Sequence, residues 1–404
     1  MAFSTIGSFF LLNGNITIVA SRLFGGIDNF QFACIPFFIL AANLMTDGDI
    51  IARIVKFSRA LLGHIPGGLA HVNILSSMLF AGMTGSAAAD AASTGRVGAM
   101  MMIQAGFPKY FSASISAVSS IICPIIPPST IMVIYCVAAQ NVSITAMFLA
   151  GIVPGILLGV IKMITCLIVS IRRNYPRDPK FAGWKVLFST FFSTLPALFM
   201  PFIIIGGILT GIFTPAESGV VACLYAIIIS VFVFKSMSWK KFYSCIVRTA
   251  KTTASVFLIV AFAISMGWAI TTLRIPQTLS QMIITYANSK MAFLIIANAL
   301  MLIIGTCMDV TPAILVLTPI LLPVAAQFGV DPIHIGIIIC VNLTMSLVTP
   351  PVGMVLFVTA NVNKLRLGLL FKAILPHLPL LIVILAIVTF VPALSLTIPR
   401  LFGY

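Results

Sequence analysis

The residues best placed to do chemistry in this chain are its few acids. Only 8 Asp and Glu occur among 404 residues, against 23 Lys and Arg. Asp90 and Asp309 fall inside long apolar segments, where an ionisable side chain is a functional candidate by default. Each stands in a stretch of small and hydroxyl residues, Gly82–Gly95 (the first tip) and Gly305–Pro312 (the second tip). Carboxylate, hydroxyl and carbonyl oxygens are hard ligands, so the tips predict two sites for a dehydrated alkali cation.

Two further interruptions carry a double proline. Pro127-Pro128 (the first break) and Pro350-Pro351 (the second break) each lie within an apolar segment. Proline frees carbonyl groups of the preceding turn, and in a bilayer core these must be satisfied by protein, an ion or a ligand. We expect each break to lie opposite one tip and to complete its cation site. The alternative for each break, taken alone, is a structural kink whose free carbonyl groups accept hydrogen bonds from neighbouring Ser or Thr side chains.

The sequence leaves more than one role open for Asp309 and Asp90. Asp309 stands at the start of a half-helix, so a capping role is as well supported as ion binding. For Asp90 the sequence leaves open a cap, a cation ligand or an ion pair with Arg96. Glu217, the only glutamate, follows Thr214 with capping-box spacing, which predicts a structural role at a helix start.

The composition indicates the class of protein that positions these residues. The chain is 60% hydrophobic and 8% charged, which excludes an ordinary soluble domain, a disulfide scaffold and a disordered tail. At about 20 apolar residues per helix, it supports on the order of ten membrane spans. The basic residues are scattered in short clusters between apolar runs, so nucleic acid is not an expected partner. There is no HExxH motif and no recognisable Ser/His/Asp set, so a membrane enzyme is a weak alternative.

The apolar runs predict an all-α polytopic membrane protein built from two repeats. A common offset relates Gly82 to Gly305, Gly106 to Gly329 and Pro127 to Pro350, with Pro154 and Pro376 one residue off it. Each repeat then contains a re-entrant hairpin and a helix broken at Pro-Pro, which is typical of ion transporters. The runs themselves fall at 1–20, 30–47, 67–104, 110–140, 144–171, 186–210, 219–235, 252–272, 291–327, 331–361 and 373–398.

Positive charge predicts the orientation. Placing the linker 172–185 in the cytoplasm puts most basic residues inside, and the two repeats then have opposite orientations. The basic segments 49–63 and 238–251 predict amphipathic helices in the inner lipid interface. Lys162 lies well inside an apolar run, where snorkelling or pairing with a partner protein are both open. The symmetry also predicts one opening helix more than the chain has.

Four motifs follow one another along the chain, namely Ile35–Ala41, Gly85–Ala89, Gly211–Glu217 and Thr349–Gly353. In this order they resemble the large membrane subunit of tripartite ATP-independent periplasmic (TRAP) transporters, and the similarity covers essentially the whole chain. The resemblance implies an elevator-type sodium symporter of the bacterial inner membrane that imports organic acids, with sodium as coupling ion and no other cofactor. It also implies two partners, a small four-helix membrane subunit and a periplasmic substrate-binding protein.

Carried onto matching positions, the resemblance implies that substrate lies between the tips and sodium lies within each tip-and-break pair. Substrate is expected at Ser86, Ala87, Thr306 and Cys307. One sodium site is expected at Thr84, Ser86, Asp90, Pro127 and Pro128, and the other at Gly305, Asp309, Thr349, Pro350 and Gly353. Scaffold parts are expected at 1–63 and 186–285, and transport parts at 64–171 and 286–404.

A stand-alone divalent-anion:sodium symporter, which needs no binding protein, is the alternative function. The tip residues do not discriminate among dicarboxylates, sialic acids and other acids. Relative to the family, the N-terminus is short.

Overall fold

The fold was analysed in a computed structural model that describes residues 7, 16–28, 30–274, 277–278, 281 and 289–404. All regular elements in this part of the chain are helices. Seven of them are long and apolar enough to cross a membrane, so the chain is a multi-pass membrane protein. The predicted run 1–20 lies largely outside the described residues.

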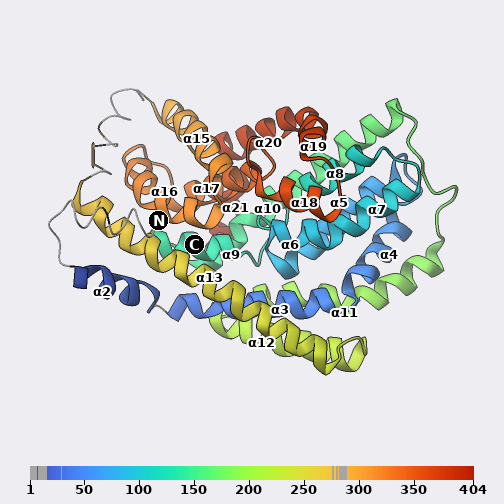
Figure 1. The fold of residues 1–404 in the computed structure, drawn as a ribbon, viewed down its shortest axis with the longest axis horizontal. Coiled ribbons are helices and arrows are strands. Elements are labelled where there is room, and N and C mark those ends of the chain that lie inside the picture. Colours follow the sequence, from blue (N-terminus) through green and yellow to red (C-terminus); the bar gives the residue numbers. More distant parts are fainter. Residues whose placement is uncertain (1–6, 8–15, 29, 275–276, 279–280, 282–288) are drawn as a thin grey trace.

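One group of helices packs around α3. It contains α3 (Cys34–Asp47), α4 (Ile50–Leu62), α11 (Trp184–Leu209), α12 (Pro215–Ile228) with its π-helical end η2 (Ile229–Val233), and α13 (Trp239–Thr272). α3 contacts both α12 and α13, which run beside it along one edge of the molecule (Figure 1). α4 is bent by 68° from α3 and packs on α11. This group contains the segments predicted as scaffold.

The structure corrects one predicted element of this group. Segment 238–251 is not a separate surface helix, because α13 runs without interruption from Trp239 to Thr272. Its basic residues therefore lie on the first turns of a spanning helix. The prediction for 49–63 matches α4, a separate basic helix whose apolar side is buried.

The remaining helices contain the four predicted interruptions, each at its expected place. The first tip separates α5 (Gly68–Thr84) from α6 (Ala87–Ala92) and α7 (Thr94–Gln104), and the first break separates α8 (Lys109–Ser120) from α9 (Thr130–Ala139). The second tip separates α15 (Lys290–Cys307) from α16 (Val310–Gln327), and the second break separates α17 (Pro332–Ser346) from α18 (Met354–Val362). Both Pro-Pro peptide bonds are cis. The helices that complete this group are α10 (Ile144–Arg172), α19 (Leu367–Ile374), α20 (Leu378–Phe390) and α21 (Ala393–Leu401).

The two repeats interlock through these half-helices. α9, which follows the first break, packs against α16 of the second tip. In the same way α18, which follows the second break, packs against α6 of the first tip. This exchange brings the starts of α6, α9, α16 and α18 to one cavity. Both the re-entrant placement of the tips in the membrane and the opposite orientation of the repeats stay predictions.

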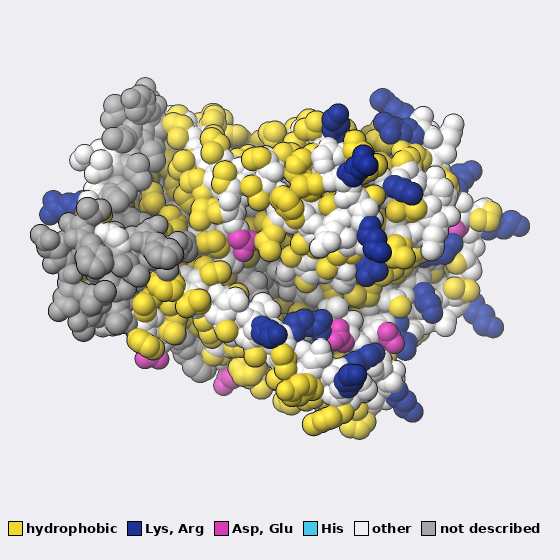
Figure 2. Space-filling view, viewed as in Figure 1, with side chains coloured by type: hydrophobic (Ala, Val, Ile, Leu, Met, Phe, Trp, Pro, Cys, Tyr) yellow, Lys and Arg dark blue, Asp and Glu magenta, His cyan; other side chains and the backbone are white. Residues whose placement is uncertain are grey.

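The linker between α10 and α11 is joined to the end of α4 by hydrogen bonds. Arg59 donates two hydrogen bonds of 2.9 Å to the Asp178 carboxylate, and the Asp178 N–H donates to the Gly63 carbonyl. The Arg59 guanidinium holds the pKa of Asp178 below its usual range. Lys and Arg gather over this end of the molecule, on the right of Figure 2. This distribution agrees with the cytoplasmic side assigned from the sequence.

The start of α12 confirms the predicted capping box. Thr214 Oγ1 accepts a hydrogen bond from the Glu217 N–H, and Glu217 Oε2 accepts one from the Thr214 N–H at 2.8 Å. Both donors belong to the first turn, which has no helical acceptor of its own. Glu217 is therefore a folding determinant.

We predict that Thr214→Ala destabilises the protein by about 1 kcal/mol, because it removes this N-cap. The measurement is the thermal unfolding midpoint of the purified chain in detergent. Thr210→Ala is the matched control, since the Thr210 hydroxyl bonds only to carbonyls of its own helix. Equal midpoints for the two variants would contradict the assignment.

Candidate functional site

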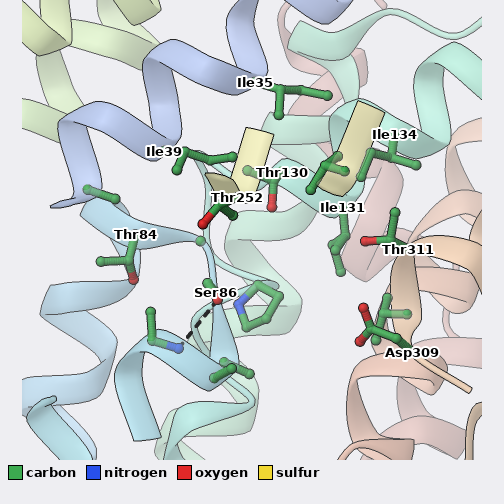
Figure 3. A pocket seen from close by; sticks show the side chains of 18 of the residues that line it. Ile35, Ile39, Thr84, Ser86, Thr130, Ile131, Ile134, Thr252, Asp309 and Thr311 are labelled. Atoms are coloured by element: carbon green, nitrogen blue, oxygen red, sulfur yellow. Dashed lines mark hydrogen bonds between the residues drawn. The ribbon is translucent and has the colours of Figure 1, made fainter. Parts of the chain in front are cut away.

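A cavity of about 380 Å³ lies where the two tips meet α3 and α13. Its lining combines residues of the tips and of the starts of α9 and α18 with residues of α3 and α13. In Figure 3, Ser86 and Thr252 lie on one side of this space, and Asp309 and Thr311 lie on the other. The cavity therefore joins the interrupted helices to the helices that pack around α3.

Four helices begin at this cavity. Its lining includes the first residues of α6, α9, α16 and α18, namely Ala87–Ala89, Thr130 and Ile131, Val310 and Thr311, and Met354 and Val355. The first N–H groups of a helix lack helical acceptors and carry a partial positive charge. Four such ends around one space favour an anion there, as phosphate and carboxylate sites at helix starts do.

The first tip rests directly on the first break. Gly85 adopts φ +56°, and a Cβ at this position would lie 2.6 Å from the Pro128 carbonyl oxygen. A larger residue is therefore excluded both by conformation and by space. Ser86, the next residue, caps α6 by accepting a hydrogen bond from the Ala89 N–H. Ser129 caps α9 in the same way, so both starts are fixed by a serine.

The second tip is also seated closely on its own repeat. A Cβ at Gly305 would lie 2.5 Å from Ser346 Oγ on α17. Asp309 occupies the N-cap position of α16, yet its side chain makes no capping hydrogen bond and lines the cavity. The carboxylate also interacts with the backbone N–H of Val310, and ion binding by Asp309 stays a prediction.

Asp90 lies on α6, within the first tip, in a buried polar cluster. It is fully buried, and its Oδ2 accepts a hydrogen bond of 2.8 Å from Ser77 Oγ. Thr94 and Cys123 lie beside the carboxylate, and Thr84 lies beside Cys123. The alternative of an ion pair with Arg96 is absent, since neither of the two ion pairs in the described chain involves Asp90. Ser86 rather than Asp90 caps α6, and ion binding by Asp90 stays a prediction.

The Asp90 cluster fits a hard cation. Asp90 Oδ1, Thr84 Oγ1 and Thr94 Oγ1 are buried and make no hydrogen bond of standard geometry, although Thr94 and Cys123 lie close enough to interact with the carboxylate. Buried polar atoms are normally satisfied, and an unpaired carboxylate oxygen is costly. Oxygen donors alone suit an alkali cation better than a soft metal. Across the residues that the structure describes, no group of three His, Cys, Asp or Glu side chains could hold a transition metal.

The predicted site residues fall into two sets. Ser86, Ala87, Thr84 and Asp309 line the cavity. The others lie outside the lining, and among them the Thr306 hydroxyl bonds to the Ile303 carbonyl of its own helix. That second set is Asp90, Pro127, Pro128, Gly305, Thr306, Cys307, Thr349, Pro350 and Gly353.

The sequence reasoning missed three polar features. Arg248 on α13 lines the cavity, although its segment reads as a surface helix. Asn342 Nδ2 donates to Asn298 Oδ1 at 2.8 Å and joins α15 to α17 below the second tip. The signal in the sequence that could have indicated this contact is the asparagine in each of the two apolar runs.

The third missed feature explains Lys162, which neither snorkels nor reaches the surface. It is 1% exposed, and its Nζ lies 2.9 Å from His377 Nδ1 inside the helix packing. His377 Nε2 in turn lies 3.3 Å from Ser114 Oγ. This pair joins α10 to the start of α20 away from the cavity.

The comparisons with known proteins agree with this architecture. Residues 1–394 match the family model "Tripartite ATP-independent periplasmic transporter, DctM component". The chain is 38% identical over 390 residues to the sialic acid TRAP transporter large permease protein SiaM of Vibrio cholerae, covering 96% of this chain and 91% of that protein. It is 38% identical over 389 residues to the C4-dicarboxylate TRAP transporter large permease protein DctM of Pseudomonas aeruginosa, with the same coverage.

A solved transporter shares the fold at much lower identity. The structure of MtrF from Neisseria gonorrhoeae has a TM-score of 0.63 at 12% identity, covering 93% of this chain and 83% of that chain. The overall helical fold is therefore shared with that structure. The family match over nearly the whole length establishes that this chain belongs to the DctM component family of tripartite ATP-independent periplasmic transporters.

Proposed function

We propose that this chain is the large membrane subunit of a sodium-coupled secondary importer of organic acids in the bacterial inner membrane. The observation that carries the proposal is the meeting of four helix starts at one cavity, because it favours a carboxylate over a neutral solute. The acids in the names of the two relatives, a sialic acid and a C4-dicarboxylate, belong to the same chemical class.

Sodium is the proposed coupling ion. The unpaired oxygens of Asp90, Thr84 and Thr94 supply one site within the first tip. Asp309 supplies a carboxylate at the second tip, facing the cavity. Occupation of these sites holds the tips in the conformation that binds the acid, so a sodium gradient drives uptake.

The family description "tripartite" supports two further components. We assign these as a small membrane subunit and a periplasmic substrate-binding protein that delivers the acid. The helices around α3 then act as the scaffold with that subunit, and the interrupted helices move against them as an elevator. The substrate to test first is the ligand of the binding protein encoded nearest to this gene.

Replacing Asp90 tests the first sodium site. In proteoliposomes that contain all three components, we predict that Asp90→Asn raises the sodium concentration for half-maximal uptake by about tenfold or more, because a charged ligand is lost. Ser119→Ala is the matched control, since this buried hydroxyl bonds only to the carbonyl of Ile115 in its own helix. An unchanged sodium dependence in Asp90→Asn would refute the site.

Replacing Asp309 tests the second tip. Asp309→Asn keeps the size of the side chain and removes its charge, so we predict weaker sodium dependence and slower uptake in the same assay. Asp331→Asn is the control, because Asp331 caps α17 away from the cavity. Unchanged uptake and unchanged sodium dependence would remove Asp309 from the mechanism. Full uptake without the binding protein would instead favour a stand-alone symporter.

A further inference from the structure

The wall formed by α3 and α13 carries one charged side chain, Arg248. It is the only cation among the described residues that line the cavity, and Asp309 is the only anion. Thr252 and Val256 line the cavity from the same face of α13, one and two turns further on. The α3 side of this wall is mostly apolar, with Ile35 and Ile39 in the lining. Arg248 therefore supplies the positive charge of this wall.

Neighbouring residues fix the position of Arg248. The Asn43 side-chain amide donates to Thr249 Oγ1 at 2.9 Å, which sets the register between α3 and α13. Arg248 Nη2 donates to Asp47 Oδ2 at 2.6 Å, and Cys245 Sγ lies 3.1 Å from the same oxygen. Asp47 lies one turn beyond Asn43 on α3, outside the cavity lining. The guanidinium is thus held at the rim of the cavity by a resident carboxylate.

Two nitrogen atoms of the Arg248 guanidinium are available as hydrogen-bond donors. Within the described chain Arg248 donates hydrogen bonds only from Nη2, so Nε and Nη1 have no partner there. Guanidinium donors form a planar fork that matches a carboxylate, often with two parallel hydrogen bonds. The Arg248 and Asp47 side chains are 46% and 23% exposed, so water and solutes reach the pair. An ion pair this exposed adds little to folding and exchanges readily.

We propose that Arg248 binds the carboxylate of the transported acid, and that Asp47 is the internal carboxylate with which the acid competes. This inference rests on the proposed function and names the residue that selects for acids. An acid gains a charge-assisted contact that a neutral analogue cannot make. When the acid leaves, the Arg248 guanidinium is again paired with Asp47 alone.

A merely structural ion pair makes a different prediction. If the pair served only to join α3 to α13, removing either partner would break the same contact and have the same effect. If Asp47 competes with substrate, its removal has the opposite effect from removal of Arg248. The two substitutions therefore separate binding from structure.

The test measures KM and kcat for sodium-driven uptake by the complete three-component system. A C4-dicarboxylate and a sialic acid are the probes, and the acid that the wild-type system accumulates is used for the variants. We expect Arg248→Gln to raise KM by about tenfold or more with kcat within about twofold, and Arg248→Lys to lie between it and the wild type. Asp47→Asn is expected to lower KM by about threefold or more. Lys251→Gln, an exposed neighbour outside the cavity, serves as the matched control.

Equal increases of KM in Arg248→Gln and Asp47→Asn would assign the pair to structure and overturn the inference. Unchanged KM in Arg248→Gln would overturn it as well, and would leave the proposed function intact. Failure of the proposed function has a different signature, because the wild-type system would then accumulate no acid on a sodium gradient, the ligand of its own binding protein included. That result would overturn both the proposed function and the inference that rests on it.

Discussion

A backbone that leaves the helix inside hydrocarbon must find its hydrogen bonds within the protein or with a bound ion, because lipid offers none. Among the described residues, the two tips and the two Pro-Pro breaks each interrupt a helix within an apolar segment. The constraint explains why the first tip is built from small residues and why Gly85 lies against the Pro128 carbonyl group. It also explains the serine caps at Ser86 and Ser129, which satisfy the helix starts that the interruptions create.

The same constraint gathers the polar features into two neighbouring places. Helix starts cannot face lipid, so the interlocked half-helices direct all four toward one cavity. The buried oxygens of the first tip that make no hydrogen bond lie together around Asp90. Ser86 faces the cavity and Asp90 lies one turn later in the buried cluster, so α6 separates the proposed anion site from the proposed cation site. A six-residue helix is a short mechanical connection between them.

The sequence alone predicted the interruptions well, and for a physical reason. Double prolines and glycine-rich tips are unfavourable in helix interiors, so their presence in apolar runs marks breaks that the structure then shows. The capping box at Thr214 and Glu217 was equally readable, because it depends on residues three apart. Arg248 was not, because a basic turn at the start of a spanning helix looks the same in sequence as a surface helix. Its position at the cavity depends on contacts between α13 and α3 that come from distant parts of the chain. The pair of Lys162 and His377 was missed for the same reason.

The central claim is that a sodium gradient moves an organic acid through the cavity between the tips. The most direct measurement is accumulation of the acid in proteoliposomes that contain this chain, its small membrane partner and the binding protein. The account predicts accumulation when sodium is high outside and low inside, and none when potassium replaces sodium at equal ionic strength and membrane potential. Equal accumulation in the two salts would contradict it.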